Sequence, residues 1–250
     1  MNIASHALII CPMNTKYIYM PVIVLSFIAN FASAVPIGSS GQDRDYLISE
    51  QPLQQWSLGV FAESRTRDVK LNNNGYPVEM ETTKTMGYVG YDAISWINTY
   101  VTYGLQKDSV YGDGSSEAAY GFGATFNLLD HEMMDPSLME DRIRLSATIQ
   151  YTFGTFDNGF GDSEAMDELY GSFIMSIVND IEGNKQYWPN AISIFAGPIF
   201  SQIISDSIQE DSIVGLTVGV EVFLSDYVTL GIGLEQFEDN GSWMALSIKF

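Results

Sequence analysis

The sequence is poor in the residues that cross-link or catalyse. Cys11 is its single cysteine, so the chain cannot form a disulfide within itself. It has two histidines, His6 and His131, and it contains no Gly-x-Ser-x-Gly motif. The sequence therefore offers few residues for a catalytic site. Neither a Ser or Cys nucleophile with a histidine base nor a pair of metal-binding histidines is readily formed from them. We expect no enzymatic activity and no cofactor.

Basic residues are also scarce. Eleven Lys and Arg stand against 31 Asp and Glu, which gives a formal net charge of −20. Nucleic-acid binding needs a basic footprint, so this function is excluded. The chain is nevertheless 46 % hydrophobic and 13 % aromatic, which is typical of a folded protein rather than a disordered one.

No apolar run is long enough for a comfortable membrane helix. Lys16 precedes the mostly apolar residues 22–28, and Ala32-Ser-Ala34 follows them. This order is typical of a secretory signal, which we predict over residues 1–34, with 1–12 as an upstream extension. A retained membrane anchor is the alternative. Cleavage would remove Cys11 and Lys16, and residues 35–54 would form a periplasmic linker before a single domain over 55–250.

From Trp56 onward, apolar and polar residues alternate with the period of a β-strand. The segment 212–224 is the clearest, since Val214 to Leu224 on even numbers are apolar and Gly215 to Phe223 on odd numbers are mostly small or polar. Turn-forming residues separate ten such segments: 56–68, 84–94, 96–107, 117–128, 142–154, 168–179, 190–203, 212–224, 227–237 and 241–250.

The two faces of these segments differ in a way that favours a membrane barrel. The apolar face is large and continuous, as lipid requires, and the other face is rich in Gly with a few charges, as a narrow interior requires. Segments 168–179 and 190–203 blur this rule, because Ile174, Val178, Phe195 and Ile199 share parity with serines. A soluble, secreted β-barrel carrier remains the alternative with the same period.

The last ten residues carry a resemblance. Met244, Leu246, Ile248 and Phe250 lie on one face of the final segment, and the chain ends on that aromatic residue. This ending resembles the closing strand of bacterial outer-membrane β-barrel proteins, where the barrel assembly machinery reads it. The resemblance implies an outer-membrane location, contact with outer-membrane lipids, and a structural or adhesion-like role at the surface.

An up-and-down antiparallel barrel of about ten strands follows, with eight as the alternative. Both chain ends then lie on the periplasmic side, and residues 69–83, 108–116, 155–167 and 204–211 form outer loops. Aromatic rings favour the membrane interfaces. We place the following in two aromatic belts: Trp56, Trp96, Trp188 and Tyr227 near the periplasmic rim, and Trp243 near the outer one.

Seven charged residues share parity with the polar face and should therefore point into the lumen. They are Glu63, Arg65 and Glu235 in the outer half and Arg142, Arg144, Glu221 and Lys249 in the periplasmic half. Buried charges require partners, so we expect ion pairs that fill a narrow barrel. A charged constriction in a narrow diffusion pore is the alternative.

Two acidic segments could suggest metal binding. Asp157 to Asp162, with Glu164, Asp167 and Glu168, is rich in Gly and carboxylates, but its spacing does not match an EF-hand loop. A second acidic segment surrounds His131, on the periplasmic side. We interpret both as solvated loops rather than as metal sites.

Overall fold

The structure is a computed structural model of the 250-residue chain. It describes residues 56–71, 77–94, 96–110, 114–133, 141–157, 163–181, 189–225 and 227–250. The predicted signal segment and linker lie outside these residues. No helix in the described part of the chain is long and apolar enough to cross a membrane.

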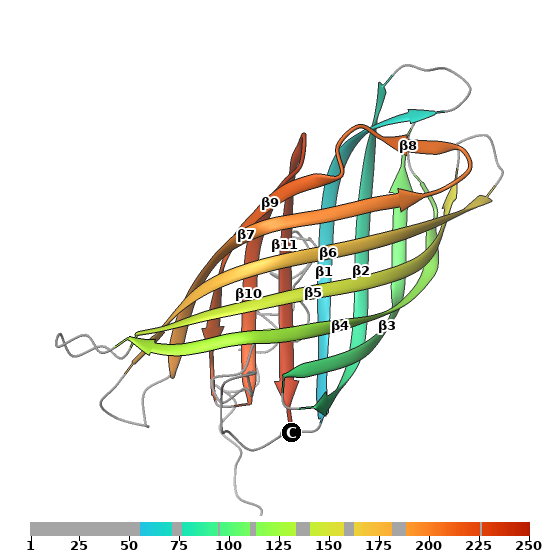
Figure 1. Ribbon diagram of the computed structural model, residues 1–250. Coiled ribbons are helices and arrows are strands. Elements are labelled where there is room, and N and C mark those ends of the chain that lie inside the picture. Colours follow the sequence, from blue (N-terminus) through green and yellow to red (C-terminus); the bar gives the residue numbers. More distant parts are fainter. Residues whose placement is uncertain are drawn as a thin grey trace, which may run out of the picture. The chain divides into compact units, whose positions relative to one another are not determined.

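Ten long antiparallel strands close into a barrel (Figure 1). They are β1 (Trp56–Leu71), β2 (Pro77–Ile94), β3 (Ile97–Ser109), β4 (Ser116–Met133), β5 (Asp141–Asp157), β6 (Ser163–Asp180), β7 (Ala191–Ile204), β9 (Val214–Phe223), β10 (Val228–Gln236) and β11 (Asn240–Lys249). The barrel closes between β1 and β11, from Ser57 opposite Lys249 to Arg65 opposite Gly241. The predicted closed antiparallel barrel is confirmed with ten strands, and the alternative count of eight is wrong.

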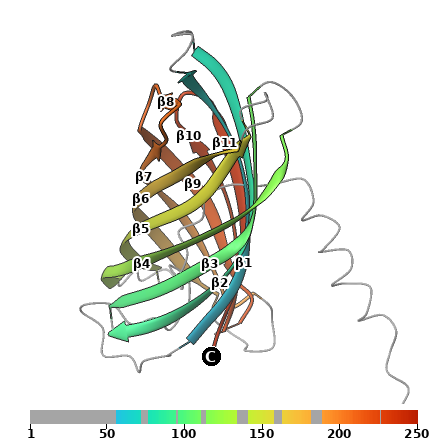
Figure 2. The ribbon, with the colours of Figure 1, turned by 90° about the vertical axis from the view of Figure 1, so that its right-hand side faces the viewer.

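The two ends of the barrel differ. At the terminal rim, Trp56 and Phe250 exchange backbone hydrogen bonds of 3.2 and 2.9 Å, which brings the start of the barrel to the C-terminus. At the far rim lies β8 (Ile208–Glu210), a three-residue strand in the connection between β7 and β9 (Figure 1). Figure 2 shows β3 to β6 crossing the barrel obliquely, on the wall opposite β10 and β11.

Side chains alternate between the outside and the inside of the barrel as the sequence period predicts. The outer face is an apolar belt, with Val218 49 %, Leu216 63 % and Ile194 62 % exposed. The inner face carries glycines, polar and charged residues together with a number of large buried aromatic and aliphatic side chains. The architecture is that of a small outer-membrane β-barrel.

Several strands extend beyond their predicted ends. Most of 69–83 and 155–167, expected as outer loops, belong to the hairpins β1–β2 and β5–β6. On this part of β1 the outward residues Ser64, Thr66 and Asp68 are as polar as the inward Arg65 and Arg67. Hydrophobic alternation disappears where both faces are polar, although the backbone pairing continues. The far rim is therefore a raised sheet edge with short connections.

The apolar residues that blurred β6 and β7 lie inside the barrel. Ile174, Val178, Phe195 and Ile199 are each no more than 3 % exposed and point inward with the serines of their strands. They pack in apolar clusters within the lumen. The interior is thus a set of packed layers, some apolar and some charged.

Candidate functional site

A charged layer crosses the lumen in the half nearer the far rim. Arg65 lies at its centre, 2.5 Å from Glu63, 2.6 Å from Glu168 and 3.5 Å from Glu235. Lys84 contacts Glu168 directly and lies 3.8 Å from Glu63. We call these five residues, which come from β1, β2, β6 and β10, the charged layer. Strands from opposite walls are thereby joined through the barrel interior.

Neutral groups complete the charged layer. Tyr170 donates its hydroxyl to Glu235 over 3.2 Å, and Ser201 donates to Glu168. Arg67 lies one inward position beyond Arg65, with its guanidinium 4.0 Å from the ring centre of Phe237. With Arg67 counted, three carboxylates and three cations balance in formal charge, but the guanidinium nitrogens of Arg67 have no hydrogen-bond partner among the described residues.

Little space remains in this layer. A cavity of about 10 Å³ lies among the side chains of Phe61, Glu63, Arg65, Lys84, Gln150, Glu168 and Tyr170. A single water molecule needs at least about 10–15 Å³ of such space. The cavity among these side chains is therefore at the lower limit for a single water molecule.

An apolar cap closes the lumen above the charged layer, at the far rim. Its members are Val69, Met80, Phe156, Met166, Ile203 and Ile208. Ile208 comes from β8, which pairs with the end of β1 beyond the last residues of β11. Between the cap and the charged layer, Asp108 accepts hydrogen bonds from Thr82 at 2.6 Å and Gln106 at 2.7 Å.

An aromatic layer lies on the other side of the charged layer. It contains Phe61, Met86, Tyr88, Tyr100, Ala119, Ile174, Phe195, Trp243 and Ala245. The prediction that Trp243 belongs to an aromatic belt is wrong, because its side chain is 2 % exposed and lies inside the barrel. It stacks on Phe195 with the ring centres 5.3 Å apart.

Glycines on β10 make room for this indole. A Cβ atom on Gly231 or Gly233 would lie 2.8 or 2.6 Å from the ring of Trp243, closer than real Cβ contacts allow. The Gly-rich inner face of β10 therefore receives a large ring from the next strand. Trp243 is an odd-numbered residue, like the polar and small residues of its strand. The alternation in the sequence therefore already indicated that its side chain points inward.

A second charged group lies near the terminal rim. Lys249 pairs with Asp92 at 2.8 Å, and Asp130 lies 3.2 Å from Arg144 and 3.7 Å from Arg142. Glu221 is buried on the same inner face. The structure thus places all seven predicted lumen residues on the inside, but in two separate groups with the aromatic layer between them.

Sequence reasoning missed several partners of these charges. Glu168 was assigned to an acidic outer loop, which is wrong, because it lies within β6 and is buried in the charged layer. Lys84 and Arg67 were not assigned to the lumen, and Asp130 was assigned to a turn. Parity could have found Glu168, since it stands two and four positions before the inward Tyr170 and Ser172.

The other predicted belt residues lie on the outside of the terminal rim or outside the described part of the chain. Trp56 is 47 % and Tyr227 55 % exposed, and Trp56 lies 5.0 Å from the ring of Tyr91. Trp96 is partly buried beside Phe126, and Trp188 falls outside the described residues. Of the predicted assembly signal, Met244, Leu246 and Ile248 share the outer face of β11, and Phe250 is exposed at its end.

The two acidic segments show no metal site in the described part of the chain. No group of three or more His, Cys, Asp or Glu residues there could hold an ion. Residues 158–162 of the first segment fall outside the described residues. His131 is exposed at the end of β4, near the terminal rim.

Comparisons with known proteins give no family. No family model matches the sequence, and no curated protein matches it. Among solved structures, an outer membrane channel from Pseudomonas putida F1 is similar, at a TM-score of 0.41 and 11 % identity over 84 % of this chain and 99 % of the other. Neisserial surface protein A gives 0.35 and 12 %, over 78 % and 97 %. The β domain of the Bordetella autotransporter BrkA gives 0.39 and 12 %, over 77 % and 99 %.

Proposed function

We propose that this protein is an outer-membrane β-barrel with a closed lumen and a contact role at the cell surface. It is a non-enzymatic structural or adhesion-like protein, and its working surface is the raised far rim. The single observation that supports this role most directly is the packed interior. The lumen is filled from the aromatic layer to the apolar cap. Only the outer face and the two rims then remain available for interaction with other molecules.

The membrane location is supported by the outer face of the barrel. Exposed Val, Leu, Ile, Phe and Tyr side chains surround it, and water would not tolerate so large an apolar surface on a monomer. Lipid would, since a closed barrel satisfies every backbone group internally. We propose that the terminal rim faces the periplasm, as chain ends do in bacterial barrels, and that the assembly machinery recognises β11.

The packed lumen argues against the two other functions. A diffusion pore needs a continuous water-filled path, and the charged layer leaves about 10 Å³. A soluble carrier needs an internal cavity for its ligand and a polar exterior, whereas this barrel has a packed interior and an apolar exterior. The ion pairs fix the plug in place, because separating them inside the barrel would leave charges without partners.

Planar-bilayer recording tests the closed lumen. We expect no single-channel steps from the wild-type protein, with insertion verified by sedimentation with lipid and by altered gel mobility before boiling. Reproducible wild-type steps that change on Arg65→Gln or Glu235→Gln would instead establish the pore.

A further inference from the structure

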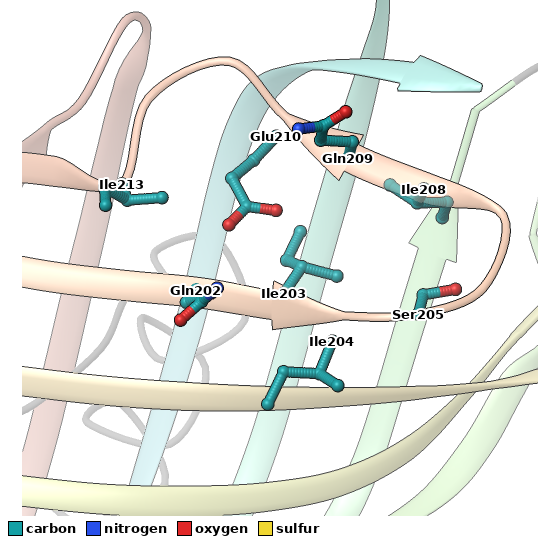
Figure 3. A pocket seen from close by; sticks show the side chains of 8 residues that line it. All are labelled: Gln202, Ile203, Ile204, Ser205, Ile208, Gln209, Glu210 and Ile213. Atoms are coloured by element: carbon teal, nitrogen blue, oxygen red, sulfur yellow. The ribbon is translucent and has the colours of Figure 1, made fainter. Parts of the chain in front are cut away.

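An open groove lies at the far rim, between the end of β7 and β8 (Figure 3). We call it the rim groove. Gln202–Ser205 line one side and Ile208–Glu210 the other, with Ile213 beside them. Residues 205–207 connect the two strands at one end, and at the other end Ser201 N–H donates to the carbonyl of Ile213 at 2.9 Å. The groove is therefore bounded at both ends.

The rim groove has the dimensions of a small-molecule site. Its volume is about 450 Å³, which falls within the roughly 300–1,000 Å³ of ligand pockets in general. Its side on β7, from Gln202 to Ser205, covers about 10 Å, because a strand rises about 3.3 Å per residue. The groove thus suits a short molecule that lies between the side chains of the two strands.

The walls of the groove are largely aliphatic. Ile204 and Ile213 are 45 % and 41 % exposed along it. Ile203 and Ile208 are buried at the point where the groove meets the apolar cap. Covering the exposed isoleucine surface with hydrocarbon is favourable, because it removes apolar area from water. A ligand of this groove therefore has an aliphatic body.

The carboxylate of Glu210 points into the space between β8 and β7 (Figure 3). Among the described residues, no hydrogen-bond or ion-pair partner reaches this carboxylate, whereas the neighbouring Asp211 is paired with Lys70. A ligand that covered Glu210 without offering it an opposite charge would remove its hydration uncompensated. The polar end of the ligand is therefore a cation.

Further carboxylates surround Glu210 at this rim. Asp211 follows it in the chain, and the N–H of Asp211 donates to the carbonyl of Asp68 at 3.2 Å. Glu238 and Asp239 belong to the turn between β10 and β11. Loss of hydration, followed by the carboxylates of Asp211, Asp68 and Asp239, raises the pKa of Glu238, so these groups lie close enough to repel one another. Their negative potential attracts cations and repels anionic ligands.

We propose that the rim groove binds a small aliphatic cation, an amine with a short hydrocarbon chain. The ammonium group lies against the carboxylate of Glu210, and the hydrocarbon packs on Ile204 and Ile213. This small-molecule site goes beyond the proposed surface-contact function and does not depend on it.

Other small molecules of similar size fit the groove less well. A carboxylic acid of the same length would place a second negative charge beside Glu210 and the acidic rim. A neutral alcohol would donate a hydrogen bond to Glu210 but supply no opposite charge. Methylammonium would supply the charge but leave the isoleucines uncovered. An aliphatic amine meets both requirements.

Isoleucine-methyl NMR of the full-length protein, folded in detergent, tests this site. The probe is hexylammonium, and the comparison compounds are hexanoate, hexanol and methylammonium in the same detergent. We expect hexylammonium to shift the methyl signals of Ile204 and Ile213 saturably, and each comparison compound to bind about tenfold more weakly or less. Ile194, 62 % exposed on the outer wall, is the internal control, because its methyl signal reports partition of the probe into the micelle.

Two variants separate the charged contact from the apolar one. Glu210→Gln should weaken the binding of hexylammonium about tenfold and leave that of hexanol unchanged. Glu81→Gln, at an exposed position of β2, should change neither and is the matched control. Ile213→Ser should weaken hexylammonium several-fold without changing methylammonium, because it removes hydrocarbon contact alone.

Several results would overturn the proposal. Equal binding of hexanol and hexylammonium, or an unchanged affinity in Glu210→Gln, would replace the cation site by apolar adsorption. Shifts of the Ile194 signal in proportion to those of Ile204 would show partition into detergent, and the absence of any saturable shift would leave no site. The bilayer recording is independent of these results, so failure of the rim groove and failure of the closed lumen are distinguishable.

Discussion

At the scale of single residues, Glu168 holds the charged layer together. It contacts Lys84, lies 2.6 Å from Arg65 and accepts a hydrogen bond from Ser201, so it joins β6 to β1, β2 and β7. A buried ion pair adds little over a well-packed apolar substitute, but losing one partner leaves the other charge buried and uncompensated. Because removing one partner costs more than the pair contributes, we expect substitutions of Glu168 to reduce the stability of the barrel strongly.

Glu168→Ala should lower the free energy of unfolding by about 3–5 kcal/mol, because Arg65 and Lys84 would lose their shared carboxylate. The midpoint of urea unfolding in lipid vesicles measures this change. Glu81→Ala, at an exposed position on the outer face of β2, is the matched control. Adding Lys84→Met to Glu168→Ala should recover part of the loss. Equal small effects of Glu168→Ala and Glu81→Ala would contradict the ion-paired layer.

The contact between Gly233 and Trp243 leads to a second prediction. Gly233→Ala should destabilise the barrel by about 1–3 kcal/mol, because the new methyl group would overlap the indole. Gly87→Ala is the control, since its Cβ would meet nothing closer than 3.7 Å. Trp243→Leu should rescue the Gly233→Ala variant in the same unfolding assay. A harmless Gly233→Ala would mean that Trp243 does not lie against β10.

At the scale of elements, each strand has a lipid-facing and a lumen-facing side. Val218→Lys, on the outer face of β9, should lower the free energy of unfolding in vesicles by about 2–4 kcal/mol, as a cation near the bilayer midplane does. Thr66→Lys also faces outward, but on the polar part of β1, so its cost should be close to zero. If the two substitutions cost the same, the apolar belt does not contact lipid.

The strands also show how far the sequence could predict the structure. On β9 and β10 one face is apolar and the other is Gly-rich, so their limits and orientation could be predicted. The ends of β1 and β6 could not, because their outward and inward residues are both polar. Glu168 was missed for another reason: it begins the predicted segment 168–179 but was grouped with the acidic residues before it.

The sequence also could not predict which charged residues pair with one another in the lumen. Parity placed Arg65 and Glu235 inside, but the stagger of neighbouring strands decides which inward residues meet at one level. Predicting the position of Trp243 would have required knowing that the small residues of β10 lie against its ring. The contacts of the charged layer therefore became visible only with the pairing registers.

At the scale of the whole molecule, the lumen is a stack of layers. Along β1, the inward residues Phe61, Glu63, Arg65, Arg67 and Val69 pass from the aromatic layer through the charged layer to the apolar cap. Each layer ties several strands together across the interior. The barrel is consequently expected to be rigid, with its far rim held as a fixed surface for contact.

Quenching of tryptophan fluorescence tests the closed lumen most directly. A variant with Trp56, Trp96 and Trp188 changed to Phe keeps only Trp243, and the protein has four tryptophans in all. In vesicles, we predict that neither brominated acyl chains nor aqueous acrylamide quenches Trp243, because it lies inside a packed barrel. A variant that keeps only Trp56 should be quenched by the brominated lipid. Strong quenching of Trp243 by acrylamide would reveal a hydrated lumen and contradict the account, and quenching by bromine would show that its ring faces the membrane.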